Sequence, residues 1–172
     1  MGTVTPPTLE TPRLQLRAVA LSDAPFFLQL LNDPSWLENI GDREVRSNAA
    51  AEDYIRNSIW AQYRAYGYGM YAVELKAMAA PVGICGLVKR DFLSAPDLGF
   101  ALLPQYAGLG YASEAARALL AHAARDLQIE RLYAITKRSN ERSIRLLTRL
   151  GFRHDGPFVT PQGAEVDLYA TT

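Results

Sequence analysis

The chain has 172 residues but only one cysteine and two histidines. Cys85 has no partner for an intramolecular disulfide, which excludes an extracellular scaffold stapled by several bridges. One thiol with His122 and His154 also falls short of the ligand sets that usually hold zinc, so we expect no metal. Cys85 itself lies in the apolar run Val82–Leu87, where a buried thiol is more common than a reactive one.

Neither sign of charge is in excess, because 18 lysines and arginines balance 18 aspartates and glutamates. Nucleic-acid-binding domains usually carry a basic surplus that neutralises phosphates, so we expect no nucleic-acid partner. No apolar run approaches the roughly 20 residues that span a bilayer, and residues 1–8 lack the basic and apolar parts of a secretory signal. We therefore expect a soluble cytoplasmic protein with no membrane partner, present as a monomer or homodimer.

No repeat, low-complexity tract or linker divides the chain. We therefore expect a flexible arm at residues 1–8 and one domain over residues 9–172. Alternating apolar residues from Leu14 to Ala18 predict a half-buried first strand. The residues from Ser22 to Pro25 are typical of a helix start, and Asn32–Pro34 is typical of its end.

The stretch from Trp36 to Asn48 has no clear period and is predicted to be a loop with at most a short helix. A second helix, capped by Ser47 or Asn48, carries apolar residues at helical spacing as far as Tyr63. A turn is expected at Ala79–Pro81. The other predicted elements are strands at 70–75, 82–89 and 98–103, a helix at 112–127, a strand at 132–136, a helix at 141–150, and strands at 152–158 and 166–170. This order predicts a mixed α/β fold with one central sheet.

Two glycines, Gly108 and Gly110, lie between the strand at 98–103 and the helix that follows. Glycine permits backbone conformations closed to other residues and lets a ligand come close. The first turn of a helix has unpaired N–H groups at the positive end of its dipole, which suits a phosphate or pyrophosphate. Gly110–Ala112 lacks the lysine of a nucleoside-triphosphate loop, and Ser113 stands where a dinucleotide fingerprint has its third glycine. A tight structural turn with no ligand is the alternative.

The loop belongs to a longer pattern. Gln105–Gly110, read as Gln-x-x-Gly-x-Gly, resembles the first signature of the GNAT superfamily of N-acetyltransferases. Asn140–Phe152, with Asn-x-x-Ser at its start and Leu-Gly-Phe at its end, looks like the second signature. Thr11–Leu14 and Asn32–Pro34 are similar to the RimJ/RimL-like branch. The resemblance covers the chain from Leu9 to Ala170.

The resemblance implies a mostly antiparallel sheet that is splayed between its fourth and fifth strands, at 98–103 and 132–136, and flanked by about four helices. Acetyl-CoA would be the cosubstrate, and its pantetheine arm would pair with the backbone of the fourth strand around Phe100, Ala101 and Leu102. Its pyrophosphate would be received by the loop and the helix start, that is by Gln105, Ala107, Gly108, Leu109, Gly110, Tyr111 and Ala112.

The family reaction is the direct attack of a primary amine on the thioester. An alkyl amine must first lose a proton, and Asp97, at the start of the fourth strand, is the candidate base through a water relay. The alternative is that Asp97 only closes a turn. Many relatives carry a tyrosine as acid where this chain has Leu147, so Ser143 is the candidate that assists the leaving thiolate. Asn140 and Ser143 would also hydrogen-bond the pantetheine or sulfur, with helix capping by Asn140 as the alternative.

The acceptor is expected to be a protein N-terminus or a small amine such as an amino acid, a polyamine or an antibiotic. Glu38 and its acidic neighbours are candidates to attract a cationic amine, and Trp36 and Tyr71 are candidates for an apolar wall of the substrate site. The alternative is that these acids are only solvated loop charges. A function of another class also fits the missing tyrosine: an acyl-CoA-binding regulatory module without catalysis.

Overall fold

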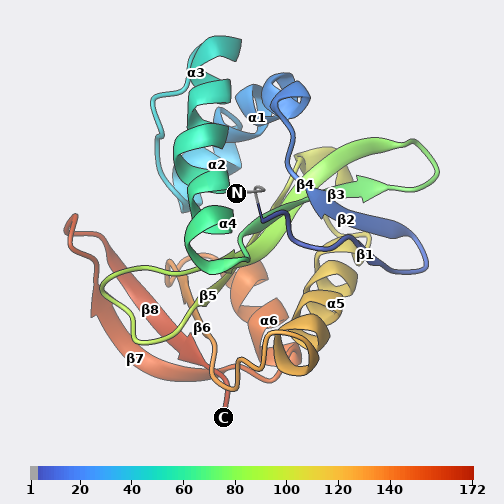
Figure 1. Ribbon diagram of the computed structural model, residues 1–172. Coiled ribbons are helices and arrows are strands. Elements are labelled where there is room, and N and C mark those ends of the chain that lie inside the picture. The colour runs from blue at the N-terminus through green and yellow to red at the C-terminus, as the bar shows by residue number, and fades with distance from the viewer. Residues whose placement is uncertain (1–3) are drawn as a thin grey trace.

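Eight strands form one open sheet in the order β1-β2-β3-β4-β5-β6-β8-β7 in a computed structural model that describes residues 4–172 (Figure 1). The strands are β1 Leu9–Glu10, β2 Leu14–Ala18, β3 Met70–Leu75, β4 Ala80–Val88, β5 Asp97–Leu102, β6 Tyr133–Thr136, β7 Arg153–Val159 and β8 Glu165–Ala170. Every neighbouring pair is antiparallel except β5 and β6, which run parallel. The mixed, mostly antiparallel sheet confirms the predicted fold class.

Helices cover both faces of this sheet. They are α1 Ala24–Leu31, α2 Pro34–Asn39, α3 Asn48–Tyr54, α4 Trp60–Tyr66, α5 Tyr111–Arg125 and α6 Glu141–Arg149. A π-helical turn at Ile55–Ile59 joins α3 to α4, so these two form one continuous helical stretch. The short helix α2 falls in the segment predicted to be mainly loop, and it begins because Asp33 accepts a hydrogen bond from the Ser35 N–H with Pro34 in the first turn.

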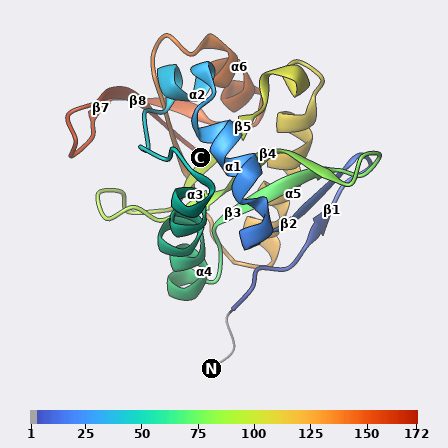
Figure 2. The same ribbon diagram turned by 90° about the horizontal axis from the view of Figure 1, so that it is seen from above.

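The two faces of the sheet have separate cores. Within β3, Tyr71 and Val73 pack on the side of α5 and α6, whereas Met70 and Ala72 pack on the side of α1 to α4. This alternation follows from the period of two along a strand. Figures 1 and 2 show α1 to α4 gathered on one side of the sheet and α5 on the other. Any opening between neighbouring strands of this sheet therefore lies between two packed layers.

Some predicted boundaries move. The expected turn at Ala79–Pro81 is wrong, because β4 already begins at Ala80 and the turn occupies residues 76–79, with Ala79 at a positive φ of 49°. Pro81 is tolerated there because it stands at the second position of the strand, next to a register irregularity in β3. The short strand β1 was not predicted, since two residues give no periodicity to read.

The expected N-terminal arm is described only in part, since its residues 1–3 lie outside the described residues. Within the remainder, Pro6 is buried and the Tyr71 hydroxyl donates a hydrogen bond of 2.7 Å to the Pro7 carbonyl. The flexibility of the arm stays a prediction. None of the helices in residues 4–172 combines the length and apolarity needed to cross a membrane.

Candidate functional site

The sheet opens between β5 and β6. The two strands share a single register pair, Asp97 with Tyr133, and the Tyr133 N–H donates to the Pro96 carbonyl at 2.9 Å. Beyond that point no pairing joins them over the described residues, so the strands diverge from a closed end at Asp97 toward an open end at Leu102 and Thr136. This is the splay that the resemblance implied. Because the strands are parallel, the segments that follow both of them begin at the same, open end.

One edge of β5 presents backbone groups to this gap. The Leu103 N–H donates to the Val82 carbonyl of the β4 segment at 2.9 Å. Residues of an antiparallel strand alternate between hydrogen-bonding to the neighbour and pointing away from it, so Ala101 also bonds β4 while Phe100 and Leu102 turn their N–H and C=O groups toward the gap. The prediction for Ala101 is corrected accordingly: its side chain can border the gap, but its backbone is already paired.

The glycine-bearing loop forms the open end on the β5 side. After the 3₁₀ turn Pro104–Tyr106, Gly108 and Gly110 adopt positive φ angles of 78° and 86°, which other residues enter only with strain. Gly110 is the N-cap of α5 and has no side chain to cap it. Among residues 4–172, no side chain accepts a hydrogen bond from the N–H groups of Tyr111–Ser113. The start of this 15-residue helix is therefore open to an anion.

Arg13 braces this loop, which the sequence did not reveal. Its Nε and its backbone N–H donate to the two carboxylate oxygens of Glu114 at 2.8 and 3.2 Å, and its Nη1 donates to the Leu109 carbonyl at 3.0 Å. The guanidinium carbon also lies 4.5 Å from the centre of the Tyr111 ring. Arg13 and Glu114 are 101 positions apart, so only the fold could bring them together.

The charge of Glu114 explains what Arg13 does. A carboxylate in the first turn of α5 favours the helix but repels a phosphate bound at the same end. Burial alone would raise the pKa of the Glu114 carboxyl, and the hydrogen bonds from Arg13 outweigh it and lower that pKa. Glu114 therefore stays charged, and the Arg13 guanidinium beside it offsets that charge at the start of α5.

Removing this cation has a measurable consequence. We expect Arg13→Ala to weaken coenzyme A binding about 10-fold, or about 1.4 kcal/mol, because the Glu114 charge becomes uncompensated. Adding Glu114→Gln to Arg13→Ala is expected to recover most of that affinity, as measured by isothermal titration. A double variant that binds no better than Arg13→Ala would show that Arg13 acts through the shape of the loop.

Asn140 and Ser143 lie at the same open end, on the β6 side. The Asn140 Oδ1 accepts a hydrogen bond of 3.2 Å from the Ser143 N–H, so Asn140 caps α6. The structure shows this capping role, and a ligand role for the Asn140 amide nitrogen stays a prediction. The cap uses only the side-chain oxygen, and both residues are half-buried, so the Asn140 amide nitrogen and the Ser143 hydroxyl stay candidates for contact with a ligand.

Asp97 lies at the closed end of the gap and is only 2% exposed. Arg90 Nε lies 3.1 Å from each of its carboxylate oxygens. Burial raises the pKa of Asp97, and the charge and hydrogen bond of Arg90 oppose that rise. A buried carboxyl with a raised pKa beside a single cation is the environment of many general bases.

Two other predicted features are settled by burial. Leu147, in α6, is 1% exposed and packs in the core on the α5 side of the sheet. Its side chain therefore does not reach the gap, where an acid would be needed. Cys85 is also 1% exposed, and burial raises the pKa of its thiol to about 12. A thiol that stays protonated at neutral pH is not a nucleophile, as the sequence indicated.

The predicted substrate wall is wrong in its composition. Trp36 packs in the core on the side of α1 to α4, whereas Tyr71 packs in the opposite core, so the two never line one surface. Glu38 contributes a backbone contact instead: its carbonyl accepts a hydrogen bond from the Lys137 ammonium group, just after β6. This contact ties α2 to the open end of the gap.

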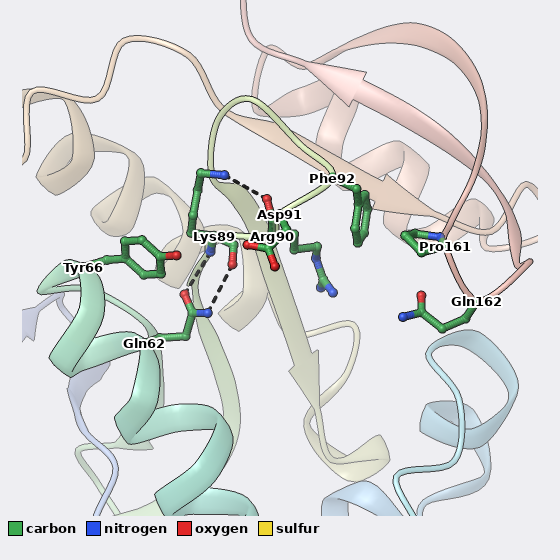
Figure 3. Close-up of a pocket in the computed structure, with 8 residues that line it drawn as sticks. All are labelled: Gln62, Tyr66, Lys89, Arg90, Asp91, Phe92, Pro161 and Gln162. Carbon is green, nitrogen blue, oxygen red and sulfur yellow. Dashed lines mark hydrogen bonds between the residues drawn. The ribbon is translucent and has the colours of Figure 1, made fainter.

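A hollow near the closed end is the other candidate for a binding surface. Its volume is about 590 Å³, within the range of small-molecule sites. Figure 3 shows its residues coming from α4, from the loop between β4 and β5, and from the turn between β7 and β8; they are Gln62, Tyr66, Lys89, Arg90, Asp91, Phe92, Pro161 and Gln162. Sequence reasoning missed it because its three segments lie far apart along the chain and share no motif.

Within residues 4–172 no group of three or more His, Cys, Asp and Glu side chains could hold a metal ion.

Comparison with known proteins agrees with this geometry. Residues 13–153 match the family model described as an acetyltransferase (GNAT) domain. A Bacillus licheniformis protein named uncharacterized N-acetyltransferase p20 is 27% identical over 168 residues, which cover 94% of this chain and 93% of that protein. A putative GnaT-family acetyltransferase from Bordetella pertussis has a TM-score of 0.81 at 27% identity, covering 96% of this chain and 99% of that one. The ribosomal L7/L12 alpha-N-protein acetyltransferase RimL, solved with coenzyme A, has the same fold, with a TM-score of 0.82 at 22% identity over 95% of this chain and 97% of that one.

Proposed function

The chain belongs to the GNAT acetyltransferase family, and from this premise we propose that it transfers an acetyl group from acetyl-CoA to a primary amine by direct attack on the thioester. One observation carries the proposal: the uncapped start of α5 faces the splayed gap at the end where β5 and β6 diverge. Acetyl-CoA would supply the activated acyl group. The chain's own residues would hold it, orient the amine and remove its proton.

The residues of the gap fit the parts of this cosubstrate. The N–H groups of Tyr111–Ser113 would receive the pyrophosphate, helped by the two left-handed glycines that keep the approach clear. The free backbone edge at Phe100 and Leu102 would pair with the amides of the pantetheine arm, as an added strand does. The arm would then run from the open end toward Asp97, with Asn140 and Ser143 on its other side.

Asp97 would accept the proton that the amine loses. At 2% exposure its carboxylate does not meet an acceptor directly, so one water would carry the proton from the amine. Ser143 would donate a hydrogen bond to the departing sulfur. Leu147 stands where many relatives have a tyrosine, and it offers no proton. A serine hydroxyl is a weaker proton donor than a tyrosine hydroxyl, so the thiolate would leave with solvent assistance.

A screen of amines tests the transfer itself. Release of free coenzyme A thiol would be measured with acetyl-CoA and a panel of protein N-terminal peptides, amino acids, polyamines and aminoglycosides, with isothermal titration of coenzyme A beside it. We expect binding together with turnover on at least one class of amine. Binding without turnover on any amine would favour the regulatory module, and no binding at all would contradict the proposed site.

A further inference from the structure

Arg90 connects the hollow to the buried Asp97. It lies in the loop between β4 and β5, and its Nε is committed to the Asp97 carboxylate. In Figure 3 its guanidinium extends into the space between the α4 side chains and the group formed by Phe92, Pro161 and Gln162. The side chain is 33% exposed, so it is reachable from solvent while its inner edge remains paired.

The outer edge of the guanidinium is free. Over residues 4–172, neither Nη1 nor Nη2 of Arg90 has a hydrogen-bond partner. A guanidinium presents its nitrogens in a planar fork that matches the two oxygens of a carboxylate. One edge of Arg90 already binds the Asp97 carboxylate, so the other edge can take a second one without moving the side chain.

Two further polar side chains of the hollow, those of Lys89 and Gln62, already have hydrogen-bond partners. Lys89 Nζ donates to the carbonyls of Arg90 and Leu93 at 2.8 and 2.7 Å, which fixes the loop. The Gln62 side chain donates to the Lys89 carbonyl at 3.2 Å and accepts from the Lys89 N–H at 3.0 Å. Of the two cations in the lining, Arg90 is therefore the one whose terminal nitrogens are available to a ligand.

The surrounding charges favour an anion over a second cation. The lining carries Lys89 and Arg90 against the single acid Asp91, and the buried Asp97 carboxylate offsets part of the Arg90 charge from the inner side of the guanidinium. A polyamine would have to enter between these cations with only one exposed carboxylate to meet it.

We propose that the acceptor amine binds in this hollow and also carries a carboxylate, which pairs with the free terminal nitrogens of Arg90. This inference rests on the proposed acetyl transfer and narrows its acceptors to small amino-carboxylates such as free amino acids. The carboxylate, Arg90 and Asp97 would form one row of alternating charges that ends at the closed end of the gap. The acceptor's amine would thereby be held beside the water that Asp97 activates.

Matched pairs of acceptors test this inference. For several amino acids, kcat/KM would be measured for the free acid and for its amide, on the wild type and on Arg90→Gln. The ratio of acid to amide cancels both the reactivity of the amine and any general loss that the variant causes at Asp97. We expect the wild type to prefer the acids, and Arg90→Gln to lower the ratio at least about 10-fold, as the loss of a charged, forked pair requires. Arg90→Lys keeps the charge without the forked geometry, so its ratio of acid to amide is expected to lie between those of the wild type and Arg90→Gln.

Arg64→Gln is the matched control, because Arg64 is an exposed arginine on the same helix as Gln62 and should leave the ratio unchanged. A wild type that turns over amides as well as acids, or an Arg90→Gln variant with the wild-type ratio, would overturn the inference while acetyl transfer stands. If no amine is turned over, the proposed function fails, and titration of the same pairs onto the coenzyme A complex decides the inference. Loss of acid binding in Arg90→Gln would then support it, and equal binding of acid and amide would refute it.

Discussion

Replacing Gly108 by glutamate is expected to weaken coenzyme A binding at least about 100-fold, or about 3 kcal/mol. A side chain added at Gly108 meets no atom within 4 Å, so it projects into open space beside the start of α5. A carboxylate there would occupy the approach to the N–H groups of Tyr111–Ser113 and repel the pyrophosphate. Isothermal titration measures the loss.

Two controls separate charge from backbone strain. Gly108→Ala carries the same strain at a φ of 78° without the charge, and its binding should fall far less. Gly151→Glu places the same charge at another left-handed glycine in open space, just after α6, and should leave binding near the wild-type value. Each substitution should lower Tm by only about 2–8 °C, as expected for 1–2 kcal/mol of strain in a chain of this size. Equal binding by Gly108→Glu and the wild type would remove the loop from the site.

Asp97→Asn is expected to lower kcat/KM about 100-fold near neutral pH, because an amide cannot accept the proton of the amine. The carboxylate works only when deprotonated, so the wild-type rate should fall as pH drops through the pKa of Asp97. Burial raises that pKa, which places the acidic limb above the ordinary carboxyl value of about 3.9. The difference in kcat/KM between the variant and the wild type should become smaller as pH approaches the pKa of the amine, about 10, because the acceptor is then already neutral.

The measurement is a pH profile of kcat/KM for the wild type and Asp97→Asn with one acceptor. Asp53→Asn, an exposed acid on α3, serves as the control and should follow the wild-type profile. If Asp97→Asn keeps the wild-type kcat/KM and the same acidic limb, Asp97 is not the base. Its carboxylate would then serve only to hold Arg90.

The loop could be predicted because its signals are local. Gly108 and Gly110 lie within three residues of each other, between a strand and a helix that each show their own period, and the structure gives both the positive φ angles that such glycines permit. The strand alternation at Leu14–Ala18 and the capping residue Ser47 were read in the same way, and β2 and α3 follow. Local chemistry therefore determines the conformation of the loop at which we propose that the cosubstrate binds.

The hollow at which we propose that the acceptor binds could not be predicted, because it depends on which distant segments meet. Trp36 and Tyr71 suggested a shared wall by composition, but the face that each occupies is set by the register of β3 and the path of α2. The pairs Arg13–Glu114 and Arg90–Asp97 depend in the same way on loop paths and sheet order. A sequence does not show which residue an arginine pairs with, so only the fold reveals the hollow and the free terminal nitrogens of Arg90.

Binding of the ligand phosphates by the backbone N–H groups at the start of α5 can be seen in a crystal structure of the protein with coenzyme A. We expect pyrophosphate oxygens within about 2.7–3.2 Å of the backbone nitrogens of Tyr111–Ser113, with the pantetheine arm alongside β5. Phosphates bound elsewhere, or a loop closed over the helix start by its own side chains, would contradict it.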